Sequence, residues 1–156
     1  MIKLLVVGKI NGKALRELID DYLKRIQPYH KINIEEVADE ATSEDVSQQK
    51  SGRIKEGERI LGRLKPDDTV ILLDLQGDEF DSLAFAKILD EQFTYSSSTL
   101  VFVIGGSMGV SDEVQNRADR RWKLSSVTFP HQIVRLLVLE QIYRAFKINR
   151  NQTYHK

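Results

Sequence analysis

Two loops and the C-terminal tail of this sequence carry residue types that could bind a ligand or do chemistry. The first loop reads Gly105-Gly106-Ser107-Met108-Gly109 and directly follows an apolar run. It matches neither the phosphate-binding pattern that ends in Gly-Lys-Ser/Thr nor the dinucleotide pattern Gly-x-Gly-x-x-Gly. Its glycines would let the backbone approach a flat or elongated ligand closely, and they are equally typical of a simple tight turn.

The second loop, residues 124–130, is short, polar and rich in accessible backbone groups. Its N–H and C=O groups could read the edge of an adenine. By spacing alone, however, the segment is only a loop followed by Pro130 at the start of a helix. Asp74, which ends another apolar run, is either a catalytic carboxylate or a structural cap, and the cap is the favoured interpretation.

The tail ends in Tyr154-His155-Lys156. A tyrosine ring can stack on a nucleobase, and a histidine titrates near neutral pH, so the pair would suit chemistry on a base. A polar terminal segment is more often simply frayed. On these residues alone the frayed tail is the favoured interpretation.

Other kinds of site have little support. The chain has no cysteine, which removes disulfides, thiolate nucleophiles and Cys-based metal centres, and it indicates a cytoplasmic protein. The three histidines, His30, His131 and His155, are far apart and have no His-Glu-x-x-His pattern, so we expect no metal site. The longest uncharged run, residues 92–111, contains too many polar residues and glycines for a membrane span, and we expect no membrane partner.

The charge of the chain is balanced overall but divided along its length. There are 23 Lys and Arg against 23 Asp and Glu, which first argues against a nucleic-acid partner. Residues 1–116 nevertheless carry a net charge of −7 and residues 117–156 a net charge of +7. Such asymmetry indicates polyanion binding, although chance variation among helix surfaces explains it about as well.

The elements that would position these segments alternate between strands and helices. Period and composition predict strands at 2–7, 31–37, 69–73, 100–104 and 122–124, and helices at 12–26, at 82–93, from Ser111 and at 131–147. Residues 39–51 are expected to form a loop or a weakly ordered segment. Strands separated by helices form a parallel sheet, so the prediction is one α/β domain over residues 1–156.

The predicted final helix is apolar almost all round. A helix of this kind is buried on several sides. One side would pack on the sheet, and the rest would meet a second subunit, most commonly in a C2 homodimer. The alternative is a central helix in a monomer.

Taken together, the motifs resemble the RlmH family, bacterial 23S rRNA pseudouridine-N3 methyltransferases of the SPOUT superfamily. The resemblance covers the whole chain and rests on Leu72-Leu73-Asp74, the 103–109 loop, residues 124–131, Glu140-Gln141-Ile142-Tyr143-Arg144-Ala145 and Tyr154-His155. It implies a SPOUT-type parallel sheet with helices on both faces, a C-terminal trefoil knot, a homodimer and bound S-adenosylmethionine. The cofactor-binding residues that it implies are Leu73, Gly105, Leu124, Ser125, Ser126, Val127, Thr128 and Phe129.

The resemblance also implies a substrate, pseudouridine 1915 in helix 69 of 23S rRNA, methylated in the assembled 70S ribosome. Tyr154 and His155 are then the catalytic residues, with His155 as the base for the N3 proton and Tyr154 contacting the target base. The family usually has proline before this tyrosine, whereas this chain has Thr153, so the tail is expected to be more mobile before RNA binds. Candidate phosphate contacts in the basic region are Arg135, Arg144, Lys147 and Arg150.

Two functions of other classes remain as alternatives. A non-catalytic ribosome-binding α/β dimer would show the same basic surface without binding S-adenosylmethionine. A flavodoxin-like nucleotide or flavin binder would fit the α/β pattern. Residues 124–129, followed by His131, favour the methyltransferase over both.

Overall fold

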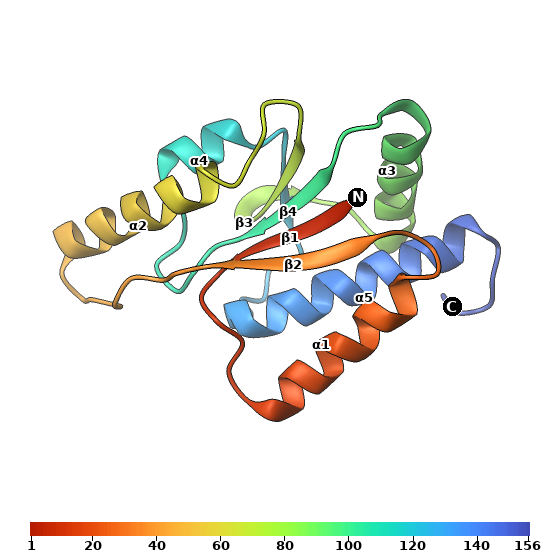
Figure 1. Ribbon diagram of the computed structural model, residues 1–156, viewed down its shortest axis with the longest axis horizontal. Helices are drawn as coiled ribbons and strands as arrows, with labels where there is room; N and C mark the ends of the chain where they lie inside the picture. Colours follow the sequence, from red (N-terminus) through yellow and green to blue (C-terminus); the bar gives the residue numbers. More distant parts are fainter.

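The computed structural model describes residues 1–156 and contains alternating strands and helices (Figure 1). Their order and bounds are β1 (Ile2–Val7), α1 (Lys13–Ile26), β2 (Ile32–Val37), α2 (Val46–Leu61), β3 (Thr69–Glu79), α3 (Ser82–Tyr95), β4 (Leu100–Ile104), α4 (Asp112–Arg117), β5 (Arg120–Lys123) and α5 (His131–Asn149).

The five strands form one sheet in the order β2-β1-β4-β3-β5, and every neighbouring pair is parallel. β1 and β4 lie inside the sheet and are almost entirely buried, because their side chains are apolar on both faces. β2 lies at an edge and alternates between buried and exposed residues. The predicted parallel α/β sheet is therefore confirmed.

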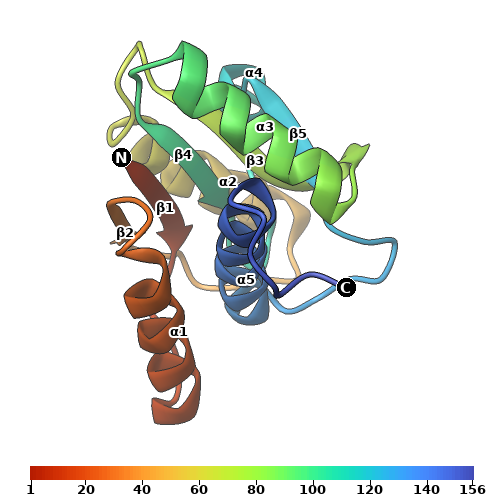
Figure 2. The same cartoon turned by 90° about the vertical axis from the view of Figure 1, so that its right-hand side faces the viewer.

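Helices cover both faces of this sheet. α1, α3 and α5 pack on one face around a core that includes Ile19, Phe85 and Val138. α2 and α4 pack on the other face around Ile60 and Val114. Figure 1 shows α2 and α4 above the sheet with α1 and α5 below it, and Figure 2 shows α3 crossing next to α5, with which it is in contact. The carboxyl ends of β1, β3 and β4 thus open into loops between these two layers.

The prediction of a loop over residues 39–51 is wrong beyond Asp45, where α2 begins. The Asp45 carboxylate accepts hydrogen bonds from the N–H groups of Ser47 and Gln48 and caps the helix. The buried face of α2 contains Gly52 and Gly57 in place of large apolar residues. A side chain at Gly57 would begin 2.4 Å from Ser111 Oγ, so close packing on α4 requires glycine and hides the helical apolar pattern.

Two other boundaries differ by a few residues. β3 continues past Leu73 to Glu79 after a shift in its register with β5. α3 ends two residues later than predicted, at Tyr95, and Ser82, which is a typical N-cap residue, is its first helical residue. The capping side chain is that of Asp81, whose Oδ1 accepts a hydrogen bond from the Ala84 N–H over 2.8 Å.

α5 forms as predicted and extends two residues further, to Asn149. It packs between α1 and α3, which explains why so little of its surface is polar. None of the helices combines the length and apolar character needed to cross a membrane. The C-terminal trefoil knot stays a prediction from the family resemblance.

Candidate functional site

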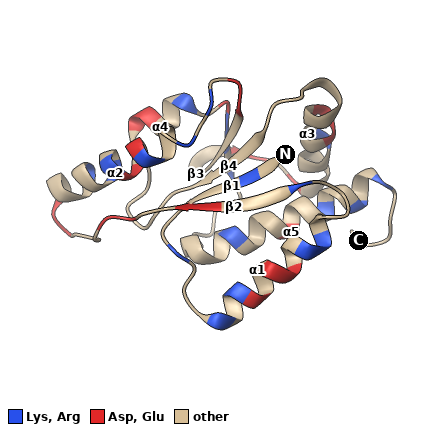
Figure 3. Cartoon of the chain, viewed as in Figure 1, with Lys and Arg blue, Asp and Glu red and all other residues tan.

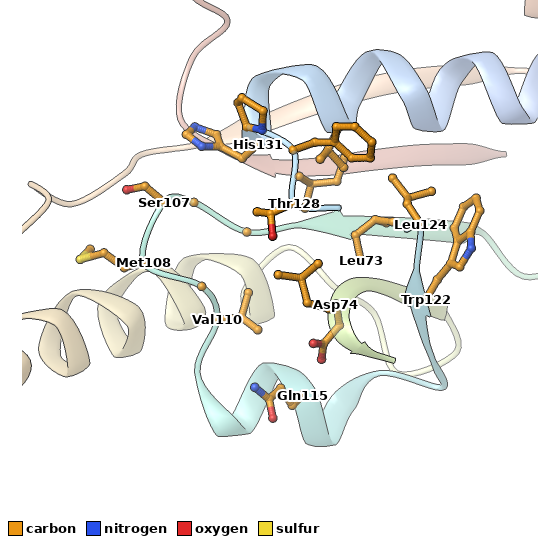
Figure 4. A pocket seen from close by; sticks show the side chains of 18 of the residues that line it. Leu73, Asp74, Ser107, Met108, Val110, Gln115, Trp122, Leu124, Thr128 and His131 are labelled. Atoms are coloured by element: carbon orange, nitrogen blue, oxygen red, sulfur yellow. The ribbon is translucent and has the colours of Figure 1, made fainter. Parts of the chain in front are cut away.

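A cavity of about 730 Å³ lies at the carboxyl ends of β3 and β4, where the predicted ligand loops meet (Figure 4). Parallel α/β sheets bind ligands at this edge because the loops that follow neighbouring strands converge there. The cavity is lined by Leu73 at the end of the apolar part of β3, by the 104–110 loop and by most of the loop before α5. The predicted cofactor residues that line it are Leu73, Gly105, Leu124, Ser125, Val127, Thr128 and Phe129.

Ser126 is the one predicted cofactor residue outside the lining. Its side chain is exposed, and its Oγ donates a hydrogen bond to Glu79 Oε1 over 3.3 Å. Ser126 therefore ties its loop to the end of β3, while the loop residues on either side of it face the cavity.

One end of the cavity is apolar and flat. Trp122, Leu124 and Leu73 form its wall in Figure 4, and Val127 and Phe129 at the rim are 64% and 37% exposed. Apolar walls next to free backbone N–H and C=O groups suit a planar heterocycle with polar edges.

The glycine loop is both a tight turn and a wall of the cavity. Gly109 has φ +84° and donates its N–H to the Gly106 carbonyl over 3.1 Å. A Cβ at Gly105 would lie 2.6 Å from Val110 Cγ1, so no larger residue fits there without movement. The two interpretations of these glycines, a tight turn and a close approach of the backbone to a ligand, are therefore compatible.

The side of this loop away from the cavity rests on α2 and on the segment before it. Thr42 Oγ1 and Ser107 Oγ are 2.9 Å apart. Glu56 is only 3% exposed, and its Oε2 accepts a hydrogen bond from the Glu40 N–H, while its Oε1 has no partner. Burial, the largest influence, raises the pKa of the Glu56 carboxyl, which lies next to Gly106.

Asp74 lines the cavity, but both of its oxygens are used within the fold. Oδ2 accepts from Arg121 Nε over 2.6 Å, and Oδ1 accepts from the Gln76 N–H over 2.8 Å. This arrangement agrees with the structural role favoured from the sequence.

Several lining residues were not predicted to bind the cofactor, among them His131, Ile104, Trp122 and Arg53. Burial, together with the Arg135 guanidinium, lowers the pKa of His131, which stands at the start of α5. Ile104 could have been predicted, because it is the last residue of a buried parallel strand, and ligands bind at that edge of the sheet. Arg53 had no such signal, since it lies on a helix whose N-terminal half was predicted to be a loop.

Arg135 does not lie where a phosphate contact would require, and that prediction is wrong for this structure. Its side chain is fully buried, and its Nη2 donates to the carbonyls of Val7 and Gly8 over 2.8 and 3.0 Å. Nη1 lies 3.6 Å from Glu36 Oε2. Arg135 therefore fastens α5 to the carboxyl end of β1.

The tail lies against the C-terminal half of α5. The Tyr154 hydroxyl donates to Glu140 Oε1 over 3.2 Å, and its ring meets that of Tyr143 edge-on with 4.9 Å between centroids. Burial, followed by the neighbouring Tyr22 and Glu140, raises the pKa of Tyr154 to about 12, so its phenol is neutral at physiological pH.

His155 is held by a cation. Arg144 Nη1 lies 3.1 Å from His155 Nδ1, and Arg144 also forms an ion pair with Glu140. A guanidinium only donates, so Nδ1 accepts this hydrogen bond, and the Nδ1 lone pair is engaged while the tail is docked.

The remaining predicted RNA contacts lie on aromatic rings beside the tail. Lys147 Nζ is 5.6 Å and Arg150 Cζ 5.0 Å from the centroid of Tyr29. Arg25 of α1 lies over Tyr143 of α5 in the same region, and Figure 3 shows the cations of the two helices next to each other. This surface thus combines exposed positive charge with rings, as single-stranded RNA sites do.

The tail and the cavity are not brought together within one chain. Tyr154 contacts Glu140 and Tyr143, whereas the cavity contacts α5 through His131 and Val134. At a rise of 1.5 Å per residue, the Glu140 position lies about 14 Å along the helix from His131. No three His, Asp or Glu side chains come together in a way that could hold a metal ion.

Comparison with known proteins gives a consistent result. A family model described as "Predicted SPOUT methyltransferase" matches residues 1–155. A Desulfitobacterium hafniense protein named "Ribosomal RNA large subunit methyltransferase H" is 48% identical, with 99% of this chain and 98% of the relative covered. Proteins of the same name from Carboxydothermus hydrogenoformans and Bacillus pumilus are each 46% identical over 99% of both chains.

Proposed function

The chain belongs to the SPOUT methyltransferase family, and we propose that it methylates N3 of a pseudouridine in helix 69 of 23S rRNA. The methyl donor is S-adenosylmethionine, the substrate is the assembled 70S ribosome, and the reaction takes place in the cytoplasm. Relatives that cover almost the whole chain are named as large-subunit rRNA methyltransferases, which supports rRNA as the substrate. The family match favours this function over a flavin- or nucleotide-binding protein.

The observation that carries the proposal is the cavity at the carboxyl edge of the sheet. Three segments that are far apart in sequence, at Leu73, Gly105 and residues 124–129, meet around it. Its volume of about 730 Å³ is typical of small-molecule sites. Its apolar end and the backbone carbonyls of the 124–129 loop fit an adenosyl group, and a side chain at Gly105 would displace Val110, which also lines the cavity.

S-adenosylmethionine supplies an electrophilic methyl group on a sulfonium, so the proposal includes no metal ion. The residues of this chain must therefore position reactants and move one proton. The 124–129 loop and Leu73 fix the adenosyl end, and alignment of the reacting atoms can contribute about 7–11 kcal/mol to lowering the barrier.

The proton on N3 of the target base must be removed. We assign this step to His155, whose imidazole is the natural base at neutral pH once it leaves Arg144. Tyr154 remains a neutral phenol and acts by stacking on the target base or by hydrogen bonding to it. Undocking of the tail therefore precedes proton transfer.

A homodimer would solve the separation of tail and cavity. Glu140, which holds the tail, lies about 9 Å along α5 from Val134, the nearest residue of this helix that lines the cavity of the same chain. In a C2 dimer with the two α5 helices facing each other in opposite directions, the tail of one chain would reach the cavity of the other. Ile133 on α5 is 37% exposed, as is Phe129 at the cavity rim, and both would be covered by such a contact.

The RNA would lie along the surface next to the tail. Lys147 and Arg150 offer cations for phosphates, and Arg144 becomes available when His155 undocks. Arg135 is not part of this surface because it is buried.

The test is to incubate ribosomes that lack the modification with the protein and S-adenosylmethionine carrying a labelled methyl group. Mass mapping of helix 69 should then show one labelled methyl on a pseudouridine. Free 23S rRNA serves as the comparison substrate and should stay unlabelled. Label on no nucleotide, or only on a nucleotide outside helix 69, would contradict the proposal.

A further inference from the structure

Arg53 is the only lysine or arginine that lines the cavity. It lies near the middle of α2, directly after the buried Gly52, and its side chain is half-buried. Two carboxylates also line the cavity, Asp74 and Asp112, and neither forms an ion pair with Arg53. Arg53 is therefore the one cation of the cavity wall, and no carboxylate of the protein lies within ion-pair distance of it.

Two other cations of α2 are neutralised by a carboxylate. Lys55 and Arg59 both pair with Glu40, at 3.6 and 3.1 Å. Arg53 has no carboxylate within 4.0 Å, and its one hydrogen bond, from Nη1 to the Met108 carbonyl, is long at 3.4 Å. A guanidinium has five N–H donors, so most of the hydrogen-bonding capacity of Arg53 is unused.

The fold holds this guanidinium at the cavity wall. α2 presses on the glycine loop so closely that a Cβ at Gly52 would lie 2.7 Å from Met108 Cε. The stem of Arg53 runs past Gly109, with its Cδ 4.0 Å from the position of a Cβ there. Glycine at 109 adopts the positive φ of the turn.

The two ends of the cavity differ in chemistry. Leu73, Leu124 and Trp122 lie at one end in Figure 4, and Ser107 and Met108 lie at the other, close to α2. An elongated ligand with its heterocycle at the apolar end would direct its other end toward Met108 and Arg53. In S-adenosylmethionine that other end is an amino acid, and its carboxylate is the only anionic group of the molecule.

We propose that Arg53 binds the carboxylate of the amino-acid moiety of S-adenosylmethionine. The inference rests on the proposed function, because it assumes this methyl donor. Arginine matches a carboxylate with two parallel hydrogen bonds, which makes the contact specific in geometry as well as in charge. At a half-buried site we expect such a contact to contribute about a tenfold gain in affinity.

The test is calorimetric and needs no RNA. Wild type and Arg53→Met are each titrated with S-adenosylmethionine and with 5′-methylthioadenosine, which keeps the nucleoside and thioether but lacks the amino acid. We expect Arg53→Met to weaken S-adenosylmethionine binding about tenfold and to leave 5′-methylthioadenosine binding unchanged. Arg53→Lys should recover part of the loss, since it restores the charge without the bidentate geometry.

Lys50→Met is the matched control, since Lys50 is an exposed cation of the same helix that does not line the cavity. It should leave both affinities unchanged. An equal loss for both ligands in Arg53→Met would show a general effect on the loop and overturn the inference. Unchanged cofactor affinity with weakened ribosome binding would assign Arg53 to an RNA phosphate instead and also overturn it. If wild type binds no S-adenosylmethionine, the proposed function itself fails.

Discussion

At its N-terminal end α5 is fixed to the sheet by a buried arginine, whereas at its C-terminal end it carries cations that lie on aromatic rings near solvent. Arg135 donates to two backbone carbonyls of the β1 end and is completely covered. Arg150, four turns later, is exposed and lies over Tyr29. The same residue type thus holds the fold at one end and remains available to a polyanion at the other. What covers a cation, and not its place in a basic segment, decides its role.

The comparison extends to chemistry. The N-terminal end of α5 contributes His131 and Val134 to the cavity, while the C-terminal end holds the Tyr154-His155 tail through Glu140 and Arg144. Binding of the methyl donor and handling of the base are therefore separable properties of this helix. The predictions below test that separation.

The largest expected effect concerns the tail. His155→Ala should lower turnover about 10²–10⁴-fold while leaving S-adenosylmethionine affinity unchanged, because the cavity lies at the other end of α5. Single-turnover rates and calorimetry measure the two quantities. Unchanged turnover with an unchanged pH profile would remove His155 from the mechanism.

A second prediction concerns the cavity and should show the opposite pattern. Gly105→Val places its Cβ 2.6 Å from Val110 Cγ1, and overpacking of this kind costs about 1–3 kcal/mol. Cofactor affinity should fall about 5- to 150-fold, with the tail contacts intact. Far-ultraviolet circular dichroism checks that the chain remains folded. Wild-type affinity in this variant would place the ligand elsewhere.

These two variants together test the dimer. If a tail serves the cavity of its partner, mixing His155→Ala chains with Gly105→Val chains creates sites that have an intact cavity and an intact tail. Part of the activity should then return after subunit exchange. If a tail serves its own chain, the mixture should be as inactive as its components.

Arg135 in α5 and Arg150 just after its end should separate stability from RNA affinity. Arg135→Met should destabilise the protein by about 1–3 kcal/mol, since the Val7 and Gly8 carbonyls lose their buried donor. Arg150→Met should change the free energy of unfolding by less than about 0.5 kcal/mol and reduce the salt dependence of ribosome binding by about one phosphate contact. Urea unfolding and binding at several salt concentrations measure both. A stability loss in Arg150→Met, or weakened ribosome binding by a fully stable Arg135→Met, would contradict the different roles given to the two arginines.

The smallest expected effect is a pH dependence of stability that arises from Glu56, next to the glycine loop of the cavity. The folded-state pKa of Glu56 is raised above its ordinary value of 4.5, so the ionised carboxylate is disfavoured in the folded protein. The stability that its protonated form contributes is present below pH 4.5 and is lost as pH rises through the raised pKa. Glu56→Gln cannot ionise, so its stability relative to wild type should increase over that range. A difference that stays constant with pH would contradict this.

The sequence was most informative where one signal dominated. The apolar runs Ile2–Val7 and Leu100–Ile104 allow only buried strands, and the ends of such strands place Leu73 and Gly105 at a ligand edge. It was least informative where tertiary contacts decide. Gly57 looks like a helix breaker until α4 packs against it, and Arg135 looks like a surface cation until α5 covers β1.

The tail illustrates a different limit. The residue types of Tyr154 and His155 made them candidates, but only the family resemblance favoured a catalytic role over a frayed tail, because a polar terminus looks the same whether docked or frayed. Their contacts with Glu140 and Arg144 depend on spacing along a helix that the sequence predicts well. The contact with a second subunit depends on a partner that one sequence does not describe.

The uninterrupted helix between His131 and Asn149 has one more consequence, for how this protein can change in evolution. Each residue of a helix turns it by about 100° and lengthens it by about 1.5 Å. One residue inserted between Val134 and Glu140 would rotate the tail-holding face by that angle relative to the cavity-lining face. Four inserted residues would restore the angle but add about 6 Å. Individual side chains of α5 can therefore be exchanged in evolution, whereas the number of residues between Val134 and Glu140 must stay the same.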